Sequence, residues 1–490
     1  MVLSEIGSLI RQSSHYLTGH ILRMVAGFIS FPILTRVLSV EDYGILGLIT
    51  TTLFIGTAIA KFGLPEAAVR FYAEFDTNRL NKFYTTVILT SGAIGAGVTA
   101  FFILTAKWID RLFFNGNAAT LLWISSVLIL ISCLTTSLTS LFRAQQKTKL
   151  YNIITVISRY GSLSLSIFLI FFLVGGIRGF YVGQIIWGFI ILCILLSIPI
   201  RRGQISIKSF SPGILNEAVK FGFPLLFAEL GSLLLNYSDR YLVQIYLGSA
   251  SLGLYIAAYN LATYVSEVII YPINYAVTPI YMKMLVGKGE EETKKFLSKV
   301  FSFFLLIMLP AIFGFVGVGK ELVTVLASSR YMEADIILPY IIFGQAIHAS
   351  SLILNNGLFI KKKTYLVTII MIIACMVNIG LNLILIPYSG ILGAAQATLI
   401  SYTFHTALIT YFSFRIFSFP IEYRRGFLYL VASFVMFLAI SYMEFGGAIR
   451  NILGKMIVGA LIYLFLVSLM DERIKRFLVN IAYKAKIKSF

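Results

Sequence analysis

Long apolar stretches separated by short polar gaps run along the whole chain. A helix that crosses the hydrocarbon layer of a membrane needs roughly 17–25 mostly apolar residues. By this measure, about fourteen segments qualify as spans. They are 14–37, 43–63, 83–106, 119–142, 150–174, 177–200, 221–247, 251–281, 296–318, 334–360, 365–387, 391–414, 426–444 and 451–470. The pattern predicts an all-α, polytopic membrane protein.

The composition supports this prediction. The chain is 58% hydrophobic and only 12% charged, whereas a soluble domain carries roughly a quarter charged residues. All three cysteines, Cys133, Cys193 and Cys375, fall inside apolar runs. We therefore expect neither a disulfide framework, nor a metal site, nor a bound cofactor.

The net charge of +19 raises the possibility of a nucleic-acid partner. A nucleic-acid binder gathers its basic residues on one water-facing domain. Here they lie in the gaps between apolar segments, so membrane topology explains them better, and no nucleic acid is expected. With a cytoplasmic N-terminus, the inner gaps hold the basic groups at 70–82, 143–149, 201–220, 283–299, 361–363 and 415–425, and the tail after Asp471. The outer gaps hold only Lys107, Arg111, Arg178, Lys320, Arg330 and Arg450. This asymmetry predicts a multi-pass protein of the cell membrane with both termini cytoplasmic.

Two halves of the chain resemble each other. TRVLSVEDYGIL (35–46) aligns with QIYLGSASLGLY (244–255), which places Gly44 on Gly253. Farther on, LFRAQQKT (141–148) parallels LFIKKKT (358–364), and GIRG (176–179) parallels GILG (390–393). The predicted organisation is a six-helix lobe at 1–200, a cytoplasmic linker at 201–220, a second six-helix lobe at 221–414, and two extra helices with a basic tail at 415–490. Such repeats place a transport site between the halves.

Charged residues inside predicted spans are the candidate functional residues. An arginine cannot lose its proton, so inside the membrane it must be paired or hydrated. Several converging cations suit an anion with many oxygens, such as a phosphate or diphosphate. The candidate substrate-binding residues are Arg23, Lys61, Arg159, Arg240 and, on the same helix face as Arg240, Asn236. No catalytic residue is expected.

Three carboxylates accompany these cations. Glu229, Glu267 and Asp239 either neutralise the cations or carry a coupling Na⁺ or H⁺. Asp239 and Arg240 are adjacent, so they could instead fix a helix end or an outer gate. Lys61 lies near a span end and could extend its amine to the membrane surface. His348 and His405 are interpreted as hydrogen-bonded core residues rather than proton relays.

The segments FISFPILTRVLSVEDYGILGLITT (28–51), FGLPEAAVRFYAE (62–74), SDRYLVQIYLG (238–248) and ASLGLYIAAYNLA (250–262) resemble the polysaccharide-export flippase family. Its superfamily includes the multidrug and toxic compound extrusion (MATE) antiporters and the lipid II flippases. The resemblance implies two six-helix lobes around a V-shaped cavity, with two extra C-terminal helices. It also implies that basic residues line the lobes, here Arg23, Arg159 and Arg240. The first two spans hold only Arg23, Arg36 and Lys61, so the arginine cluster of the lipid II branch is not matched.

The expected function is therefore a flippase that moves a prenyl-diphosphate-linked oligosaccharide from the cytoplasmic to the outer leaflet. Its partners would be this substrate, membrane lipids, and a polysaccharide polymerase and glycosyltransferases; we expect a monomer. The alternatives are an ion-coupled drug antiporter, which favours an acidic cavity, and a lipid II-type flippase. An enzyme is not expected, because no loop exceeds about twenty residues, which leaves no room for an extramembrane catalytic domain.

Overall fold

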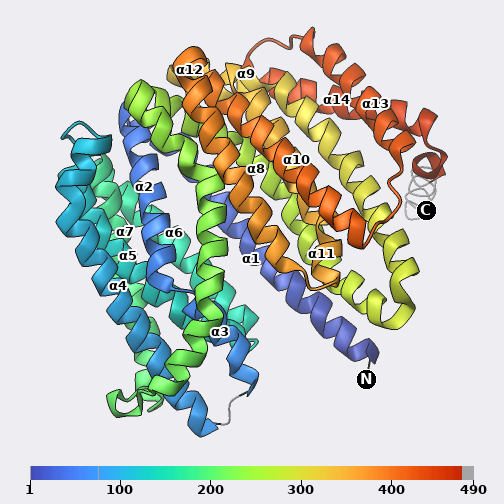
Figure 1. Cartoon of the computed structure of the whole chain (residues 1–490). Coiled ribbons are helices and arrows are strands. Elements are labelled where there is room, and N and C mark those ends of the chain that lie inside the picture. Colours follow the sequence, from blue (N-terminus) through green and yellow to red (C-terminus); the bar gives the residue numbers. More distant parts are fainter. Residues whose placement is uncertain (1, 75–76, 477–490) are drawn as a thin grey trace, which may run out of the picture. The chain divides into compact units, whose positions relative to one another are not determined.

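The computed structural model describes residues 2–74 and 77–476, and their side chains except those of 2–16, 73, 77–78, 207, 271 and 274–276. The last part of the predicted basic tail, 477–490, lies outside this range. Within the described residues every regular element is a helix (Figure 1), so the predicted all-α class is confirmed.

Seven α-helices precede the predicted linker. They are α1 (Val2–Val37), α2 (Val40–Lys61), α3 (Leu64–Phe71), α4 (Thr77–Phe113), α5 (Ala119–Ala144), α6 (Thr148–Phe172) and α7 (Gly176–Arg201). The helices after it are α8 (Pro212–Gly317), α9 (Gly319–Leu322), α10 (Leu338–Leu354), α11 (Asn356–Ile360), α12 (Thr364–Ile416), α13 (Tyr423–Ser441) and α14 (Ala448–Met470). Short helical turns are η1 (Tyr72–Glu74), η2 (Ile207–Ser209), η3 (Val323–Ala327) and η4 (Ser329–Ile336).

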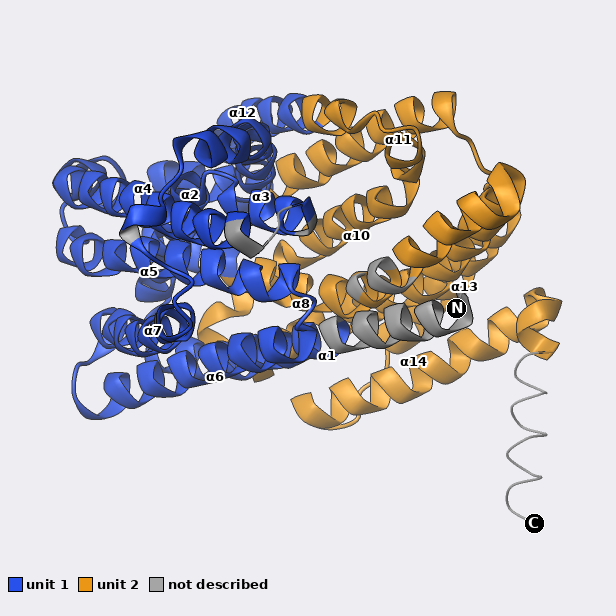
Figure 2. Cartoon of the chain, turned by 90° about the horizontal axis from the view of Figure 1, so that it is seen from below, with its two compact units in different colours: residues 1–256, 371–394 blue, residues 257–370, 395–490 orange. Residues whose placement is uncertain are grey.

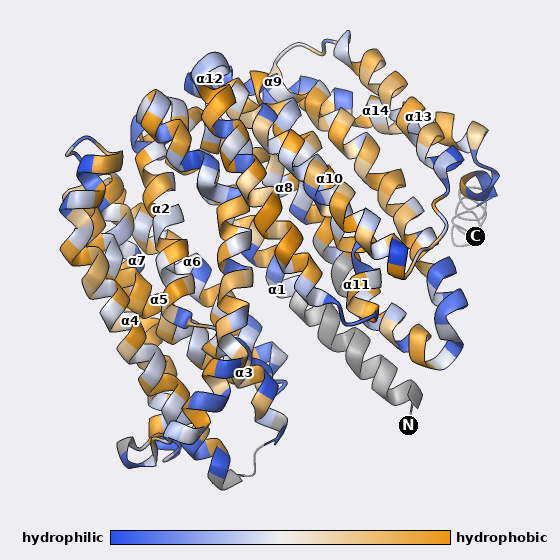
Figure 3. Ribbon diagram, in the orientation of Figure 1, coloured by the Kyte–Doolittle hydropathy of each residue, from blue (hydrophilic) through white to orange (hydrophobic). Residues whose placement is uncertain are grey.

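Eleven helices of the described chain are long and apolar enough to cross a membrane, or twelve if a pair bent by 60° at 329–360 is one span. Figure 3 shows how hydrophobic residues predominate along them. Two of these stretches, Pro212–Ile270 and Thr364–Ile416, each cover two predicted spans. Gly248 and Gly390, inside them, have φ of 80° and 60°, a conformation that glycine adopts without strain. The polytopic membrane class is confirmed, whereas the number fourteen is not.

The ends of α2 follow from its sequence. Ser39 is the N-cap residue, and its side chain accepts a hydrogen bond from the backbone N–H of Asp42 at 2.9 Å. Glu41 and Asp42 in the first turn complement the positive end of the helix dipole. Lys61 occupies the last turn, where a cation is favourable. The helix thereby holds Thr51 and Thr52 at its middle and Lys61 at its end.

The chain divides into two compact units, coloured separately in Figure 2. Unit 1 comprises Met1–Ile256 and Met371–Ala394, and unit 2 comprises Ala257–Ile370 and Ala395–Phe490. The predicted lobe boundaries, with a linker at 201–220, stay a prediction. Each unit is described below by itself.

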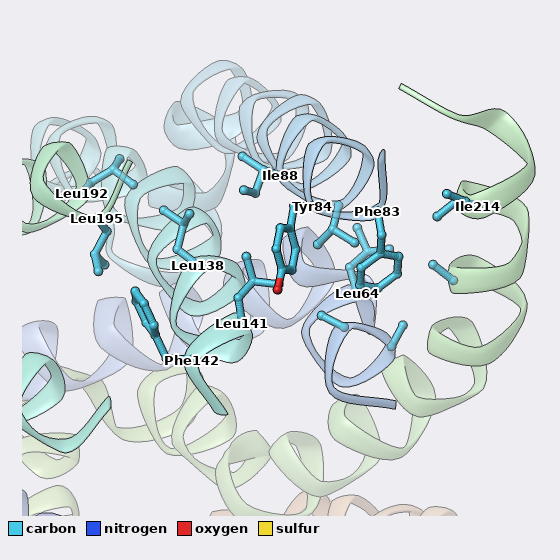
Figure 4. Packing of buried hydrophobic residues seen from close by; sticks show 14 of the residues in the cluster. Leu64, Phe83, Tyr84, Ile88, Leu138, Leu141, Phe142, Leu192, Leu195 and Ile214 are labelled. Atoms are coloured by element: carbon cyan, nitrogen blue, oxygen red, sulfur yellow. The ribbon is translucent and has the colours of Figure 1, made fainter. Parts of the chain in front are cut away.

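One part of the unit 1 core lies where α3, α4, α5, α7 and the start of α8 meet. Leu64, Phe83, Leu141, Leu195 and Ile214 represent these five helices in one cluster of buried side chains (Figure 4). A buried apolar side chain makes van der Waals contacts with neighbouring atoms on all sides, which stabilises the packed arrangement. This cluster fixes the start of α8 against the N-terminal helices.

The segment between α7 and α8 is attached to α4 by hydrogen bonds. The hydroxyl of Thr85 accepts from the backbone N–H of Ser206 at 3.2 Å, and that of Thr86 from the N–H of Ser211 at 3.0 Å. Both threonines are fully buried. The predicted linker is thus an ordered part of unit 1.

In unit 2, α13 and α14 pack against each other through Tyr429, Met436 and Tyr463. An ion pair ties α14 to α9, with Lys455 Nζ 2.7 Å from Glu321 Oε1. The two side chains are only 8% and 14% exposed. Burial acts to raise the pKa of Glu321, but the hydrogen bond from Lys455, with further favourable contacts, outweighs it and lowers that pKa below its usual value.

One pair of predicted repeat segments has the same backbone geometry. Gln146 and Lys362 occupy equivalent positions in LFRAQQKT and LFIKKKT, and each has φ of 56°. The next residue of each turn donates its backbone N–H to an equivalent carbonyl: Lys147 to Phe142 at 3.0 Å and Lys363 to Leu358 at 2.8 Å. This agreement supports the repeat inferred from sequence.

Replacing Glu321 with glutamine should destabilise the protein by about 3–5 kcal/mol, because Lys455 is left as a buried, unneutralised charge. Thermal unfolding in detergent measures the loss. Since the pKa of Glu321 is lowered by folding, the pair contributes stability above the ordinary glutamate pKa and loses it as pH falls through the folded-state value. The difference between wild type and variant should therefore disappear at low pH. Glu472→Gln, which breaks the exposed Arg476–Glu472 pair, is the control and should change little.

Candidate functional site

Within unit 1, α2 and α8 approach each other so closely at one end that only glycine fits. A Cβ added at Gly44 would lie 2.1 Å from the carbonyl oxygen of Ser249. A Cβ added at Gly253 would lie 2.0 Å from the carbonyl oxygen of Val40. Both distances are far below van der Waals contact. The two glycines that the sequence alignment placed on each other thus meet in the same close contact.

A second close approach lies at the other end of α2. A Cβ added at Gly63 would lie 2.1 Å from the carbonyl oxygen of Gly222, and one added at Gly222 would lie 2.7 Å from that of Gly63. The rings of Phe62 and Phe223 pack beside this contact with centroids 5.4 Å apart. We refer to the pairs Gly44–Gly253 and Gly63–Gly222 as the two glycine contacts.

Between the glycine contacts, polar side chains connect α2 with α8. Arg240 Nη1 donates to Thr51 Oγ1 at 3.0 Å, and the hydroxyls of Thr52 and Tyr241 are 2.8 Å apart. The guanidinium of Arg240 also lies 4.4 Å from the ring centroid of Tyr237, a cation–π distance. Arg240 is only 6% exposed, so its charge is surrounded by protein rather than by lipid.

Asp239 has a structural contact of its own. It is 1% exposed and accepts a hydrogen bond from the hydroxyl of Tyr255 at 2.5 Å. It also accepts from the backbone N–H of Arg240 at 2.8 Å. Tyr255 and Asp239 are 16 residues apart on α8, so the chain must bend between them, where Gly248 has φ of 80°. This geometry agrees with the interpretation of Asp239 as a residue that fixes a helix end.

Lys61 and Glu229 form an ion pair between α2 and α8. The amine of Lys61 is therefore directed at a carboxylate of the neighbouring helix, and not simply extended to the membrane surface. Glu229 remains 35% exposed, so the pair lies at the edge of the protein interior. Asn236, farther along α8, donates its amide to the carbonyl of Ser232 at 2.7 Å, within its own helix.

Arg23 lies against a different helix. Its Nη1 donates to Thr155 Oγ1 of α6 at 2.9 Å. Among the described residues no carboxylate forms an ion pair with Arg23. Arg159 is exposed and lies four residues after Thr155, so the two share a face of α6. The α1–α6 pair therefore carries two cations in one region.

The structure groups the predicted residues into two sets within unit 1. Lys61, Glu229 and Arg240 belong to the α2–α8 contact, and Arg23 and Arg159 belong to α1 and α6. Convergence of the two sets on a common cavity stays a prediction. Glu267 is half-buried on the part of α8 that belongs to unit 2.

Sequence reasoning missed the partners that hold these charges. Nothing in the sequence indicates that Thr51, Thr155 and Tyr255 hold these charges, because a hydroxyl inside an apolar helix more often bonds its own backbone. The contact at Gly63 and Gly222 also went unnoticed. A signal was available for the other pair, since the repeat alignment already placed Gly44 on Gly253.

The structure has counterparts among solved proteins. It is similar to the lipid II flippase MurJ in its inward closed conformation, with a TM-score of 0.78, 19% identity, and coverage of 96% of this chain and 100% of that one. It is also similar to the inward-facing conformation of a multidrug resistance MATE family transporter, with a TM-score of 0.64, 15% identity, and coverage of 80% and 94%. These likenesses define a polytopic membrane protein with the fold of flippases and transporters.

The chain belongs to the polysaccharide biosynthesis protein family, whose model matches residues 33–335 of its 490. A Haemophilus influenzae protein described as an "Uncharacterized membrane protein" is 23% identical over 400 residues, covering 79% of this chain and 94% of that protein. The "Probable low-salt glycan biosynthesis flippase Agl15" of Haloferax volcanii is 21% identical over 209 residues, covering 43% of this chain and 44% of that protein. The expected family is confirmed, and with it the expectation of a membrane protein that is not an enzyme.

Replacing Gly253 with alanine should destabilise the protein by about 1–3 kcal/mol, because the new methyl group meets the backbone of Val40 and neither backbone can yield. Gly44→Ala should behave alike. Gly97→Ala in α4 is the matched control, since nothing lies within 4 Å of its Cβ position. Alanine favours a helix over glycine, so Gly97→Ala should be neutral or stabilising. Equal unfolding midpoints in detergent for all three variants would contradict the close contact.

Proposed function

We propose that the chain is a flippase that moves a prenyl-diphosphate-linked oligosaccharide from the cytoplasmic to the outer leaflet. Unaided, such a head group would lose its hydration in hydrocarbon, at a prohibitive cost in free energy. Basic side chains inside the protein replace that hydration, while the prenyl chain stays in lipid. The family match and the Haloferax relative, whose name describes a glycan biosynthesis flippase, support this function.

The surroundings of Arg23 are the observation that best supports the proposal. It is half-buried on a membrane helix, its charge is permanent, and its described contact is the hydroxyl of Thr155. A structural role would be served by a carboxylate partner, as Glu229 serves Lys61. A guanidinium held by a hydroxyl keeps donors for a planar, multiply charged guest such as a diphosphate.

We further propose that the protein works by alternating access, with the two glycine contacts as closing points. When the glycine contacts hold α2 and α8 together, polar groups between them, such as Arg240, are shielded. Parting one contact at a time would open the site to one side of the membrane, as in rocking transporters built from repeats. The predicted lobes, at 1–200 and 221–414, would be the moving parts.

A drug antiporter of the same fold is the main alternative, with a lipid II-type flippase as the second. A carrier of cationic drugs needs negative charge where its cargo sits. In unit 1, Glu229 is neutralised by Lys61, whereas the described contact of Arg23 is a hydroxyl and not a carboxylate, which favours an anionic cargo. We place the protein in the cell membrane with both termini cytoplasmic, acting as a monomer beside glycosyltransferases and a polymerase.

Replacing Arg23 with glutamine should slow translocation about 10- to 100-fold, because a charge-assisted hydrogen bond is worth about 1.5–3 kcal/mol. The assay uses proteoliposomes and a fluorescent disaccharide on undecaprenyl diphosphate. Arg23→Lys should retain part of the rate, and Arg476→Gln, on an exposed side chain, should retain all of it. Full activity in each of the correctly inserted single variants Arg23→Gln, Arg159→Gln and Arg240→Gln would refute the proposal. Ethidium efflux by the same vesicles would point to the drug antiporter.

We also propose coupling to Na⁺ or H⁺, with Glu229 or Glu267 as the carrier. Collapsing both gradients should abolish net accumulation in the outer leaflet, because an uncoupled flippase only equilibrates its substrate. The carrier is the carboxylate whose glutamine variant loses the response to a gradient while exchange without a gradient persists. Accumulation that survives loss of both gradients would remove this part of the proposal.

A further inference from the structure

Unit 2 contains a buried polar layer that the function proposed above does not use. It is formed by the part of α8 after Ile256, by α10 and by the second half of α12, which all belong to unit 2 (Figure 2). The hydroxyls of Tyr259 and Tyr402 are 2.6 Å apart, and Gln345 Nε2 donates to Thr263 Oγ1 at 2.9 Å. His348 and His405 complete the layer.

The two imidazole rings lie beside each other. Their centroids are 4.9 Å apart, and the ring planes are inclined by 50°. The ring of His348 also stacks on Tyr402, with a centroid distance of 4.6 Å and an angle of 21°. His405 is 2% exposed. Ionisable side chains within membrane spans are rare, and here the half-buried His348 lies beside the buried His405.

The hydrogen-bonding capacity of these rings is largely unused. Among the described residues, none supplies a hydrogen bond to Nδ1 of His348 or to Nδ1 and Nε2 of His405, and these atoms are fully buried. A neutral imidazole has one donor and one acceptor nitrogen, and leaving buried groups of this kind unpaired costs about 1–3 kcal/mol each. An arrangement with this cost calls for a further hydrogen-bond partner.

We infer that His348 and His405 together bind one proton. A nitrogen of one ring takes up the proton and, as N–H⁺, donates to a nitrogen of the other ring after a modest rotation of the two side chains. The face of Tyr402 stacked on His348 favours the resulting cation. The proton is taken from water on one side and can be released to water on the other. One proton thereby pairs two of the buried nitrogens.

Other ligands fit less well. A transition metal held by imidazole needs three or four protein ligands, and the described residues contain no cluster of three or more metal-binding side chains. Hard cations such as Ca²⁺ and Mg²⁺ prefer oxygen ligands to ring nitrogens. The titratable groups in the layer are Tyr259 from α8 and Tyr402 from α12. Glu267 follows Tyr259 on α8 by about two turns.

The use of this proton in transport rests on the proposed function, whereas its binding does not. A cation in the closed layer is costly, so the protonated pair favours any state in which the layer is hydrated. Binding of a proton then shifts the population toward that state, because a ligand stabilises the conformation that binds it better. The layer would link proton uptake to a rearrangement of α8, α10 and α12.

The test exploits the small number of histidines in the chain, which is four. Full-length protein labelled with ¹⁵N-histidine is reconstituted, and magic-angle-spinning spectra are recorded between about pH 8.5 and 5, a range that covers ordinary imidazole titration. We expect the His348 and His405 signals to change together, with one proton gained per pair. Single variants His348→Gln and His405→Gln assign the signals. In each, the remaining ring should stay neutral over the same range.

Two outcomes would overturn the inference: both rings neutral throughout in the wild type, or each ring titrating unchanged when the other is removed. The wild-type titration needs no variant, so a folding defect cannot obscure it. For transport, a gradient of about one pH unit biases a one-proton reaction up to about tenfold. If this pair, rather than Glu229 or Glu267, carries the coupling proton, the ratio of the transport rates with and without the gradient should fall to one in His405→Gln. Proton binding without any flipping would refute the proposed function and leave the site intact.

Discussion

Contact between backbones at glycine is the constraint on which the rest of the candidate site depends. At Gly44 and Gly253, α2 and α8 approach to a distance that no side chain could share. At that separation the short hydroxyl of Thr51 reaches the guanidinium of Arg240 across the interface. A wider spacing would leave the buried arginine without this partner. The small residues therefore determine where the charges are held, although they carry no charge themselves.

The charges themselves fall into two kinds. Lys61 is matched by an opposite charge, Glu229, which is the arrangement expected of groups that stabilise a fold. Arg23 is held by a hydroxyl, which positions the guanidinium and leaves its charge in place. In a membrane interior, a permanent charge that is positioned but not neutralised is the pattern expected of a site that receives a charged ligand.

Much of the fold could be predicted from the sequence, because spanning helices must be long, apolar and separated by polar gaps. The repeat was also readable: the segments around Gln146 and Lys362 share a turn that sequence similarity had matched. The partners of the charges could not be predicted. Thr51 and Arg240 are 189 residues apart, and nothing in a local pattern specifies which hydroxyl a distant arginine reaches. Glu267 was selected for its charge alone, and no local pattern shows that it lies in unit 2 rather than in unit 1.

The segment between α7 and α8 donates backbone hydrogen bonds to the hydroxyls of Thr85 and Thr86 on α4, and this attachment limits how the two halves of the repeat can move. If this connecting segment were flexible, each half of the repeat could move without disturbing the other. Instead it is hydrogen-bonded to α4, and the start of α8 packs into the same core through Ile214. For the Gly63–Gly222 contact to part, α8 must bend between Ile214 and Gly222, whereas for the Gly44–Gly253 contact it can bend farther on, at interior points such as Gly248. Because the segment before α8 is attached to α4, the first turn of α8 stays fixed while the rest of the helix moves.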